Sequence, residues 1–247
     1  MWELRLVGTV EVRSARTRKA PAVGSRKART LLALLGTRRG SVVPVDEIVE
    51  VLWDGRRPRR PEAGVATLVS RLRAQFGTDV VIGGRAGYRL GEQVTVDLDE
   101  AAALAAEAEA LVREGEPALG AIAAERGLEL LSGGPVLADH PATGWAEQAR
   151  HQQARLLRRL RLAIAEAALN TGEPERARPR AEAAIAADPL DEAAYRLLMR
   201  ACFAAGEPAH ALLAYHRLRN VLAAELGTDP ALATRDLYMS VLHERHT

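Results

Sequence analysis

The pattern of apolar and polar positions changes from strand-like to helical early in the chain. Residues 2–13 (WELRLVGTVEVR) alternate apolar and polar side chains around a central glycine turn, which predicts two short strands. Helical spacing follows in residues 25–36 and 43–55, and again in residues 61–76 after a segment rich in proline and arginine. Residues 80–90 (VVIGGRAGYRL) predict a hairpin with a glycine-rich tip. The predicted order is therefore strands, three helices and a hairpin.

From Asp97 onward the pattern is helical, and no further strand is predicted. Alanine-rich segments are broken by Gly-Glu-Pro at residues 115–117, 172–174 and 206–208, and the last two breaks lie 34 residues apart. The same offset aligns Ala167 with Ala201, Leu169 with Phe203, and Ala177 with Ala211. This period is typical of tetratricopeptide helix hairpins, although chance pairing in an alanine-rich chain is the alternative. The predicted helices are residues 97–114, 117–131, 145–170, 174–187, 192–205, 208–226 and 230–245.

Composition limits the classes of protein to which the chain can belong. No apolar run reaches the roughly 18 residues that a membrane-spanning helix needs, and the N-terminus lacks the apolar core of a secretory signal. The single cysteine, Cys202, excludes an internal disulfide or a cysteine-based zinc site, and its position on an apolar helix face predicts a core residue. We expect a cytoplasmic protein.

The charged residues divide the chain into a basic part and an acidic part. Residues 1–96 carry 18 Lys/Arg and 9 Asp/Glu, a net charge of +9, whereas residues 97–247 carry 16 and 23, a net charge of −7. A basic module beside an acidic one points to a polyanionic partner for the first. The alternative is an arginine-rich surface that is only solvated.

The third predicted helix has two unlike faces. At 100° per residue its apolar stripe consists of Val65, Leu68, Val69, Leu72 and Phe76. The opposite face is small and polar and consists of Ala63, Ala66, Thr67, Ser70 and Ala74. Arg71 and Arg73 flank the stripe. Such a face fits a DNA major groove, where arginines reach phosphates and hydroxyls reach base edges, although an ordinary solvated face has the same pattern.

The basic hairpin favours the DNA interpretation. Arg85 lies at its tip and Arg89 follows Gly87-Tyr88, while the glycines permit a tight turn close to a duplex. Three helices ending in a basic hairpin constitute a winged helix, and the strands before them indicate the variant with an N-terminal sheet. The predicted fold is mainly α, with an OmpR-like winged helix-turn-helix domain at residues 1–93 and a tetratricopeptide-like helical domain at residues 94–247.

Several segments resemble one known family. GSRKARTLLALL (24–35), VPVDEIVEVLW (43–53), VSRLRAQFG (69–77) and GGRAGYRL (83–90) resemble the winged-helix half of the Streptomyces antibiotic regulatory protein family. VDLDEAAALAAEA (96–108) and the alanine-rich helices after it resemble that family's bacterial transcriptional activation domain. The resemblance covers nearly the whole chain in family order, and the chain resembles the small members.

The resemblance implies a transcriptional activator. Such proteins bind direct repeats near promoters, with a homodimer on the DNA as one arrangement, and recruit RNA polymerase holoenzyme, often for antibiotic and other secondary-metabolite gene clusters. The predicted DNA contacts are Arg26, Lys27, Thr67, Ser70, Arg71, Arg73, Arg85, Tyr88 and Arg89. The linker between the second and third helices supplies candidate polymerase contacts at Arg56, Arg57, Arg59 and Arg60, although phosphates are their alternative partners.

One departure from the family supports a second hypothesis. Many relatives carry polar side chains on the first turns of the third helix, where this chain has Ala63, Gly64 and Ala66. Few side chains then remain for paired base contacts, so specificity would depend on thymine methyl contacts, arginines and DNA shape. The alternative function is a protein-interaction adaptor whose winged helix has lost specificity.

The remaining constellations predict no chemistry. His243 and His246 lack a third ligand and suit a solvated helix end better than a metal site. The basic run Arg155, Arg158, Arg159 and Arg161 suits solvation or pairing with acidic helices, with a second nucleic-acid or polymerase contact as the alternative. No phosphate loop, nucleophile-base order or carboxylate pair is present. We therefore expect no enzyme, no cofactor and no metal.

Overall fold

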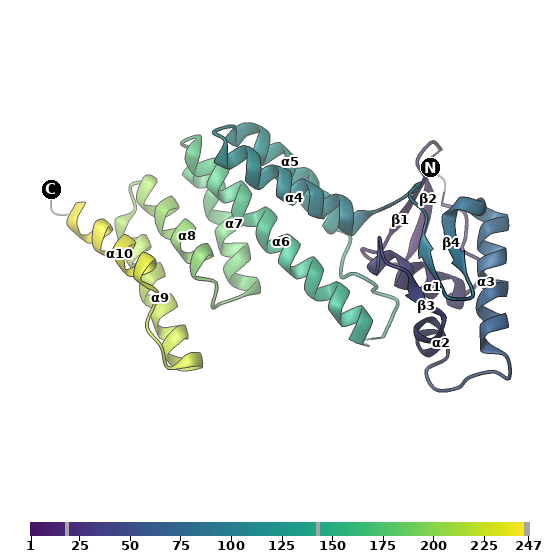
Figure 1. The fold of residues 1–247 in the computed structure, drawn as a ribbon. Helices are drawn as coiled ribbons and strands as arrows, with labels where there is room; N and C mark the ends of the chain where they lie inside the picture. Colours follow the sequence, from purple (N-terminus) through teal and green to yellow (C-terminus); the bar gives the residue numbers. More distant parts are fainter. Residues whose placement is uncertain (18–19, 142–143, 245–247) are drawn as a thin grey trace. The chain divides into compact units, whose positions relative to one another are not determined.

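The computed structural model describes residues 1–17, 20–141 and 144–244, and the chain forms two compact units (Figure 1). The first unit contains Met1–Ala101 together with Leu130–Ala154. The second contains Ala102–Glu129 and Arg155–Thr247. The compact units are thus interleaved in sequence, and the division into domains at residues 93 and 94 stays a prediction.

A three-stranded sheet opens the first unit. Strands β1 (Trp2–Arg5) and β2 (Glu11–Ser14) pair antiparallel, with Leu4 opposite Val12. On the other edge β1 pairs in parallel with β6 (Val94–Val96). The sequence pattern did not predict β6, because a three-residue strand is too short to show a period. This strand brings the end of the winged-helix sequence back to its beginning.

The winged helix follows the first two strands. It consists of α1 (Arg26–Thr37), α2 (Val45–Trp53) and α3 (Pro61–Phe76), and the second sheet has the order β3 (Val43–Pro44), β5 (Gly87–Leu90), β4 (Val81–Gly84). A short 3-10 turn, η1 (Thr78–Val80), joins α3 to β4. This order confirms the predicted winged helix-turn-helix fold.

The helix boundaries follow from local chemistry. The side chain of Ser25 caps α1 by accepting from the Ala28 N–H at 3.2 Å. The helix predicted over residues 43–55 begins later than expected, because Val43 pairs with Tyr88 in a strand instead. It ends at Asp54, which adopts a left-handed conformation with φ +44°. Helix α3 has the predicted bounds, with Pro61 at its first position.

Residues 130–154 are part of the first unit although they follow two helices of the second. Val136 bridges to Val7, the Leu137 N–H donates to the Leu6 carbonyl at 2.8 Å, and the Ala138 N–H donates to the Gly8 carbonyl at 2.8 Å. The prediction of no strand pairing after Asp97 was therefore wrong at Val136. A single bridging residue gives no alternating pattern.

Seven helices occupy the described residues of the C-terminal part, and they confirm the predicted helices with small shifts. They are α4 (Asp97–Arg113), α5 (Pro117–Leu131), α6 (Gly144–Asn170), α7 (Pro174–Ala187), α8 (Glu192–Ala204), α9 (Pro208–Leu226) and α10 (Leu232–Glu244). Helix α6 begins in the first unit and continues into the second (Figure 1).

The repeated Gly-Glu-Pro breaks have the same backbone geometry. Gly115, Gly172 and Gly206 all have positive φ, between +73° and +87°. In each turn the glycine N–H donates to the carbonyl three residues earlier, and the following glutamate N–H donates five residues back at 2.8–2.9 Å. This is a helix C-cap that only glycine adopts without strain. The proline then begins the next helix.

Small side chains let the helices of the second unit approach closely. The alanines related by the offset of 34 are buried, with exposed fractions of 0–1% at Ala167, Ala201, Ala177 and Ala211, while Leu169 and Phe203 are partly buried. Cys202 lies in the same core and is 3% exposed, as predicted. His243 is exposed and contacts the Met239 carbonyl, while His246 lies outside the described residues.

A buried carboxylate joins the parts of the first unit. Asp97, at the junction of β6 and α4, is 6% exposed. Its oxygens accept from the backbone N–H groups of Leu6 and Val7 at 2.9–3.0 Å and of Leu98 at 2.9 Å. Burial raises the pKa of the Asp97 carboxyl, and these donors oppose the rise. The Asp97 side chain thus accepts hydrogen bonds from both backbone N–H groups that follow β1.

We predict that Asp97→Ala lowers the free energy of unfolding of the first unit by about 1–3 kcal/mol, because buried N–H groups lose their acceptor. All three tryptophans of the chain, Trp2, Trp53 and Trp145, belong to this unit, so denaturation followed by tryptophan fluorescence reports on it. Asp236→Ala, an exposed change on α10, is the control. Equal midpoints for the two variants would contradict the assigned role.

Candidate nucleic-acid interface

Helix α3 presents one face to the core and the opposite face to solvent. Val65, Val69, Leu72 and Phe76 are buried, as the apolar stripe predicted. The opposite face is exposed at Ala63, Ala66, Thr67, Ser70, Arg71 and Ala74. The Thr67 hydroxyl donates to the Ala63 carbonyl at 2.8 Å, which leaves its oxygen lone pairs free to accept. A helix with this face outward can enter a groove without steric conflict.

Gly64 belongs to the packing of α3 and not to its exposed face. A Cβ at this position would lie 3.0 Å from Cη2 and 3.1 Å from Cζ2 of Trp53. The glycine therefore allows α3 to approach the end of α2. Interpreting Gly64 as a lost base contact was wrong, because its missing side chain faces Trp53.

The C-terminal end of α3 is anchored to the N-terminal sheet. The Trp2 indole N–H donates to the Phe76 carbonyl at 2.7 Å, and the two rings pack edge to face with centroids 5.1 Å apart. Gln75 donates to the Ala22 carbonyl at 2.9 Å. These contacts hold the helix at one end and leave the face at residues 63–71 open.

The wing is a tight hairpin of β4 and β5 joined by Arg85 and Ala86. Gly83 has φ +125°, and a Cβ there would lie 2.2 Å from the Gly87 carbonyl oxygen, so this turn requires glycine. Arg85 is exposed at the tip, as predicted. The hairpin lies beside α3 (Figure 1), against which β4 packs, so the Arg85 cation is carried next to that helix.

Arg73 joins α3 to the wing. Its guanidinium donates from Nε to the Val81 carbonyl at 2.8 Å and from Nη2 to the Gly83 carbonyl at 3.0 Å. Arg71 is exposed and has no hydrogen-bond or ionic partner in the described part of the chain. The two arginines were predicted to act alike, but Arg73 positions the wing while Arg71 is available to a partner.

The two other wing residues differ in exposure. Tyr88 is 6% exposed and lies in the core strand β5, between Val43 and Gly83. Its ring therefore offers no face to DNA, and a direct contact by Tyr88 is not supported by this position. Arg89 is half-buried, and its guanidinium lies 3.8 Å from the Glu92 carboxylate. It keeps one side toward solvent.

Further cations lie at the start of α1 and in the linker between α2 and α3. Arg26 and Lys27 are exposed on the first turn of α1, where the Lys27 ammonium lies 4.4 Å from the Trp53 ring centroid. The four linker residues Arg56, Arg57, Arg59 and Arg60 are exposed. Only Arg57 among them has an ionic partner within residues 1–17, 20–141 and 144–244, namely Glu50 at 2.5 Å.

The side chains of this interface are mainly cations and hydroxyls. Within the described ranges, no group of three His, Cys, Asp or Glu side chains is arranged to hold a metal ion. No helix there is long and apolar enough to cross a membrane. The arrangement is suited to binding a polyanion through arginines, with the Thr67 and Ser70 hydroxyls available to hydrogen-bond it.

Comparison with known proteins identifies the family. Residues 96–242 match the bacterial transcriptional activator domain. The chain belongs to this family. Regulatory protein AfsR of Streptomyces coelicolor is 32% identical over 94% of this chain, and DnrI of Streptomyces peucetius is 27% identical over 88%. The resemblance to the Streptomyces antibiotic regulatory proteins is confirmed, and the family is one of transcriptional regulators.

The relatives differ in length. This chain spans 23% of AfsR, 84% of DnrI and 79% of the transcriptional regulatory protein MoaR1 of Mycobacterium tuberculosis, to which it is 29% identical over 98% of its own length. The solved structure of Mycobacterium tuberculosis EmbR, in complex with a low-affinity phosphopeptide, superimposes with a TM-score of 0.87. The two sequences are 25% identical, and the matched region covers 98% of this chain and 65% of the EmbR chain. The same fold thus occurs within a longer chain.

Sequence reasoning missed the contacts that hold the interface in place. Trp2, Trp53 and Arg73 position α3 and the wing through contacts with residues far away in sequence or in another element. Trp2 and Trp53 had one available signal, since tryptophan is rare in this chain and large aromatic side chains usually anchor packing. The carbonyl partners of Arg73 had no sequence signal.

We predict different effects of Arg73→Ala and Arg71→Ala on the wing. Loss of the two Arg73 hydrogen bonds should destabilise the hairpin locally by about 1 kcal/mol and speed amide hydrogen exchange at residues 81–90 by about fivefold. Arg71→Ala, the matched control on the same helix, should leave exchange unchanged. Hydrogen exchange measured by mass spectrometry decides between them, and equal exchange in both variants would refute the tether.

Proposed function

We propose that this family member is a sequence-specific DNA-binding transcriptional activator. In this proposal it binds direct repeats near promoters, as a homodimer on the DNA, and recruits RNA polymerase holoenzyme at genes of a secondary-metabolite cluster. The observation that carries the proposal is the exposed small-residue face of α3, bordered by Arg71 and adjoined by a wing with Arg85 at its tip. The family and its named regulators support it.

Cations without acidic partners support phosphate binding. Seven of the predicted contact cations have neither a side-chain hydrogen bond nor a carboxylate within ion-pair distance in the part of the chain that the structure describes: Arg26, Lys27, Arg56, Arg59, Arg60, Arg71 and Arg85. In the second unit, by contrast, Arg158, Arg159 and Arg200 are each paired with a carboxylate. Unpaired cations on one unit keep their charge available for phosphates, which dominate affinity for duplex DNA.

The exposed face of α3 supports modest base readout. Thr67 and Ser70 provide hydroxyls that hydrogen-bond base edges, and the methyl groups of Ala63 and Ala66 suit contacts with thymine methyls. With so few polar side chains, DNA shape and deformability contribute much of the specificity. The proposed operator is therefore rich in thymine where α3 inserts.

We predict that different mutations affect overall affinity for duplex DNA and preference for the operator sequence. The operator is first selected from random duplexes with the full chain. Arg71→Ala should weaken binding to operator and scrambled duplex alike, and should reduce the log–log salt slope by about 0.9. Thr67→Ala and Ser70→Ala should reduce the operator-to-scrambled ratio by about threefold to tenfold, since a single hydroxyl supplies less than a bidentate contact.

Arg219→Ala, an exposed arginine on α9, is the control and should change neither quantity. Fluorescence anisotropy at several salt concentrations measures both. Equal losses on the two duplexes from Thr67→Ala and Ser70→Ala would show that α3 does not read the sequence. Absence of any operator in the selection would favour the adaptor hypothesis.

The linker between α2 and α3 supports a polymerase contact. Residues 54–60 are exposed, and Pro58 and Pro61 restrict the backbone beside α3. Arg56, Arg59 and Arg60 are unpaired within the described residues, so they are available to an acidic protein surface as well as to phosphates. Phosphates and an acidic protein surface both attract these cations, so DNA binding and transcription activation have to be measured separately.

We predict that Arg56→Ala combined with Arg57→Ala lowers promoter activation by about fivefold or more at saturating operator occupancy, as expected when interface residues worth about 1 kcal/mol are lost. In vitro transcription is paired with a binding titration of the same preparation. The double variant Arg59→Ala with Arg60→Ala tests the other half of the linker. Full recovery of activation at saturation would assign these arginines to DNA alone.

A further inference from the structure

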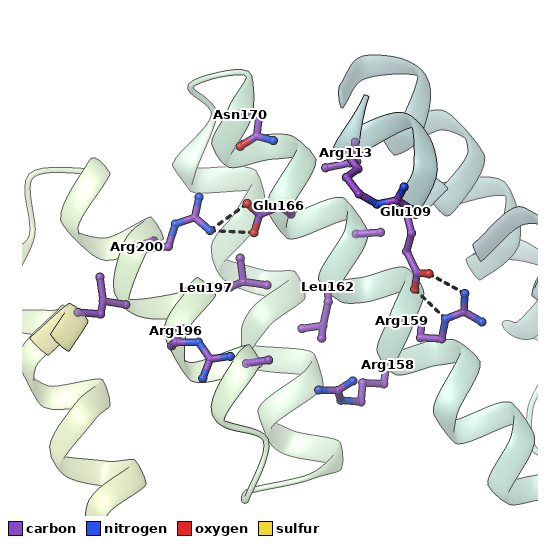
Figure 2. A pocket seen from close by; sticks show the side chains of 14 residues that line it. Glu109, Arg113, Arg158, Arg159, Leu162, Glu166, Asn170, Arg196, Leu197 and Arg200 are labelled. Atoms are coloured by element: carbon purple, nitrogen blue, oxygen red, sulfur yellow. Dashed lines mark hydrogen bonds and ion pairs between the residues drawn. The ribbon is translucent and has the colours of Figure 1, made fainter. Parts of the chain in front are cut away.

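The second unit contains a cavity that the proposed function does not use. Its volume is about 690 Å³, and it is lined by α4, α6 and α8 with Leu237 of α10 (Figure 2). Cavities of about 300–1,000 Å³ are the size at which proteins bind specific ligands. All of its lining residues belong to the second unit, so it is separate from the nucleic-acid interface.

The floor of the cavity is apolar. Figure 2 shows Leu162 of α6 and Leu197 of α8 at its centre, and Val112 and Leu237 extend the apolar lining. Leu162 and Leu237 are only partly buried, so their apolar surface remains accessible. An apolar ligand group that covered this surface would gain about 25 cal/mol for each Å² removed from water.

Five arginines surround this floor, and three of them are neutralised. Arg158 binds Asp191 at 2.6 and 2.8 Å, Arg159 binds Glu109 through two contacts of 2.7 Å, and Arg200 binds Glu166 at 2.8 and 2.9 Å. The paired Arg159 guanidinium lowers the pKa of the Glu109 carboxyl. The pairs with Glu109 and Glu166, drawn as dashed lines in Figure 2, join α6 to its neighbours α4 and α8. Together with the Arg158–Asp191 pair they form fixed walls of the cavity.

The other two arginines have no carboxylate partner of their own, although Arg113 adds to the positive charge that lowers the pKa of the Glu109 carboxyl. Arg196 donates to the Thr234 hydroxyl at 3.0 Å, and neither Arg113 nor Arg196 lies within ion-pair distance of a carboxylate among the described residues. With Asp191 counted, the lining keeps two positive charges in excess. Figure 2 shows them on opposite sides of the leucines, Arg113 toward the top and Arg196 toward the bottom.

We propose that this cavity binds a short extended segment of a partner protein in which an apolar side chain is flanked by acidic side chains. The apolar side chain covers Leu162 and Leu197, and the carboxylates meet Arg113 and Arg196. Asn170 lines the cavity with its amide unpaired within the described ranges, and an amide offers the donor and acceptor that a peptide group needs. Concave surfaces of stacked helix hairpins are suited to extended ligands.

A peptide fits the separation of the charges better than a small anion does. Arg113 comes from α4 and Arg196 from α8, with the apolar floor of α6 between them. Side chains two residues apart on an extended backbone lie on the same side, so an acidic, an apolar and a second acidic side chain at every other position face such a span together. A ligand with a single charged group would leave one arginine without a partner.

The test uses the full chain and a fluorescein-labelled peptide of sequence GDSLSEG, in which the two acids and the leucine lie on one face of an extended backbone. Fluorescence anisotropy should show saturable binding, and the peptides GNSLSQG and GDSSSEG, which lack the charges or the leucine, should each bind about tenfold more weakly or worse. Binding should also weaken as salt is added. Equal binding of the three peptides would overturn the proposal.

Variants locate the site. Arg113→Gln removes an unpaired charge and should weaken binding about tenfold. Arg196→Gln should do the same, and Ala193→Phe should abolish binding by filling the cavity. Arg219→Gln on α9, outside the cavity, is the matched control and should bind as the unchanged chain does. Thermal melting by circular dichroism verifies that each variant is folded.

The Arg113 side chain makes no hydrogen bond to another described residue, so Arg113→Gln tests the binding site without disturbing the fold. Arg196→Gln, in contrast, removes a hydrogen bond to Thr234 of α10. Wild-type affinity in both Arg113→Gln and Ala193→Phe would show that the peptide binds elsewhere. Displacement of the peptide by 4-phenylbutanoate at equal concentration would show a site for small organic anions and overturn the peptide assignment. No DNA is present in these titrations, so they are decided independently of the proposed function.

Discussion

The first unit depends on the hydrogen-bond partners of the backbone N–H and carbonyl groups of residues 6–8, which follow β1. The Asp97 carboxylate accepts from the N–H groups of Leu6 and Val7, while the Gly8 N–H donates to the Pro135 carbonyl at 3.0 Å. The carbonyls of Leu6 and Gly8 accept from Leu137 and Ala138. A buried backbone group without a partner is costly, so these three residues require both Asp97 and the segment around residue 136. Winged-helix sequence and activator-domain sequence are therefore parts of one compact unit.

The same unit holds the segment after residue 130 through polar contacts along its length. Arg150 donates to the carbonyls of Val136, Leu137 and His140, and the amide of Gln153 bonds the backbone at Gly134 and Val136. The His140 ring lies between Thr30 and Asp139 and packs edge to face on Trp145. A fragment that stopped after β6 would expose the surface that this segment covers.

The two units use arginine in different ways. Among the arginines of the proposed nucleic-acid interface, only the side chains of Arg73, Arg57 and Arg89 have hydrogen-bond or ionic partners among the described residues: Arg73 binds the wing, and the other two contact Glu50 and Glu92. In the helical unit, three of the five arginines of the cavity make two hydrogen bonds to a carboxylate. Within the described part of the chain, Arg113 and Arg196 are the two that do not. The alanine-rich core explains why such pairs matter there. Small side chains bury little apolar area, and the charged pairs add direction to the packing of helices that alanine allows to approach closely.

The sequence by itself determined the helices, the glycine turns and the faces of α3. Helical periods, proline at a first position and glycine at a C-cap act within a few residues, so the Gly-Glu-Pro breaks and the buried Ala167, Ala201, Ala177 and Ala211 were predictable. Only the tertiary structure decided which residues meet. Gly64 faces Trp53, Tyr88 is buried, Arg73 binds the wing and residues 130–154 belong with the first unit. Those outcomes depend on contacts between distant segments and on which charges find a partner, and neither leaves a period in the sequence.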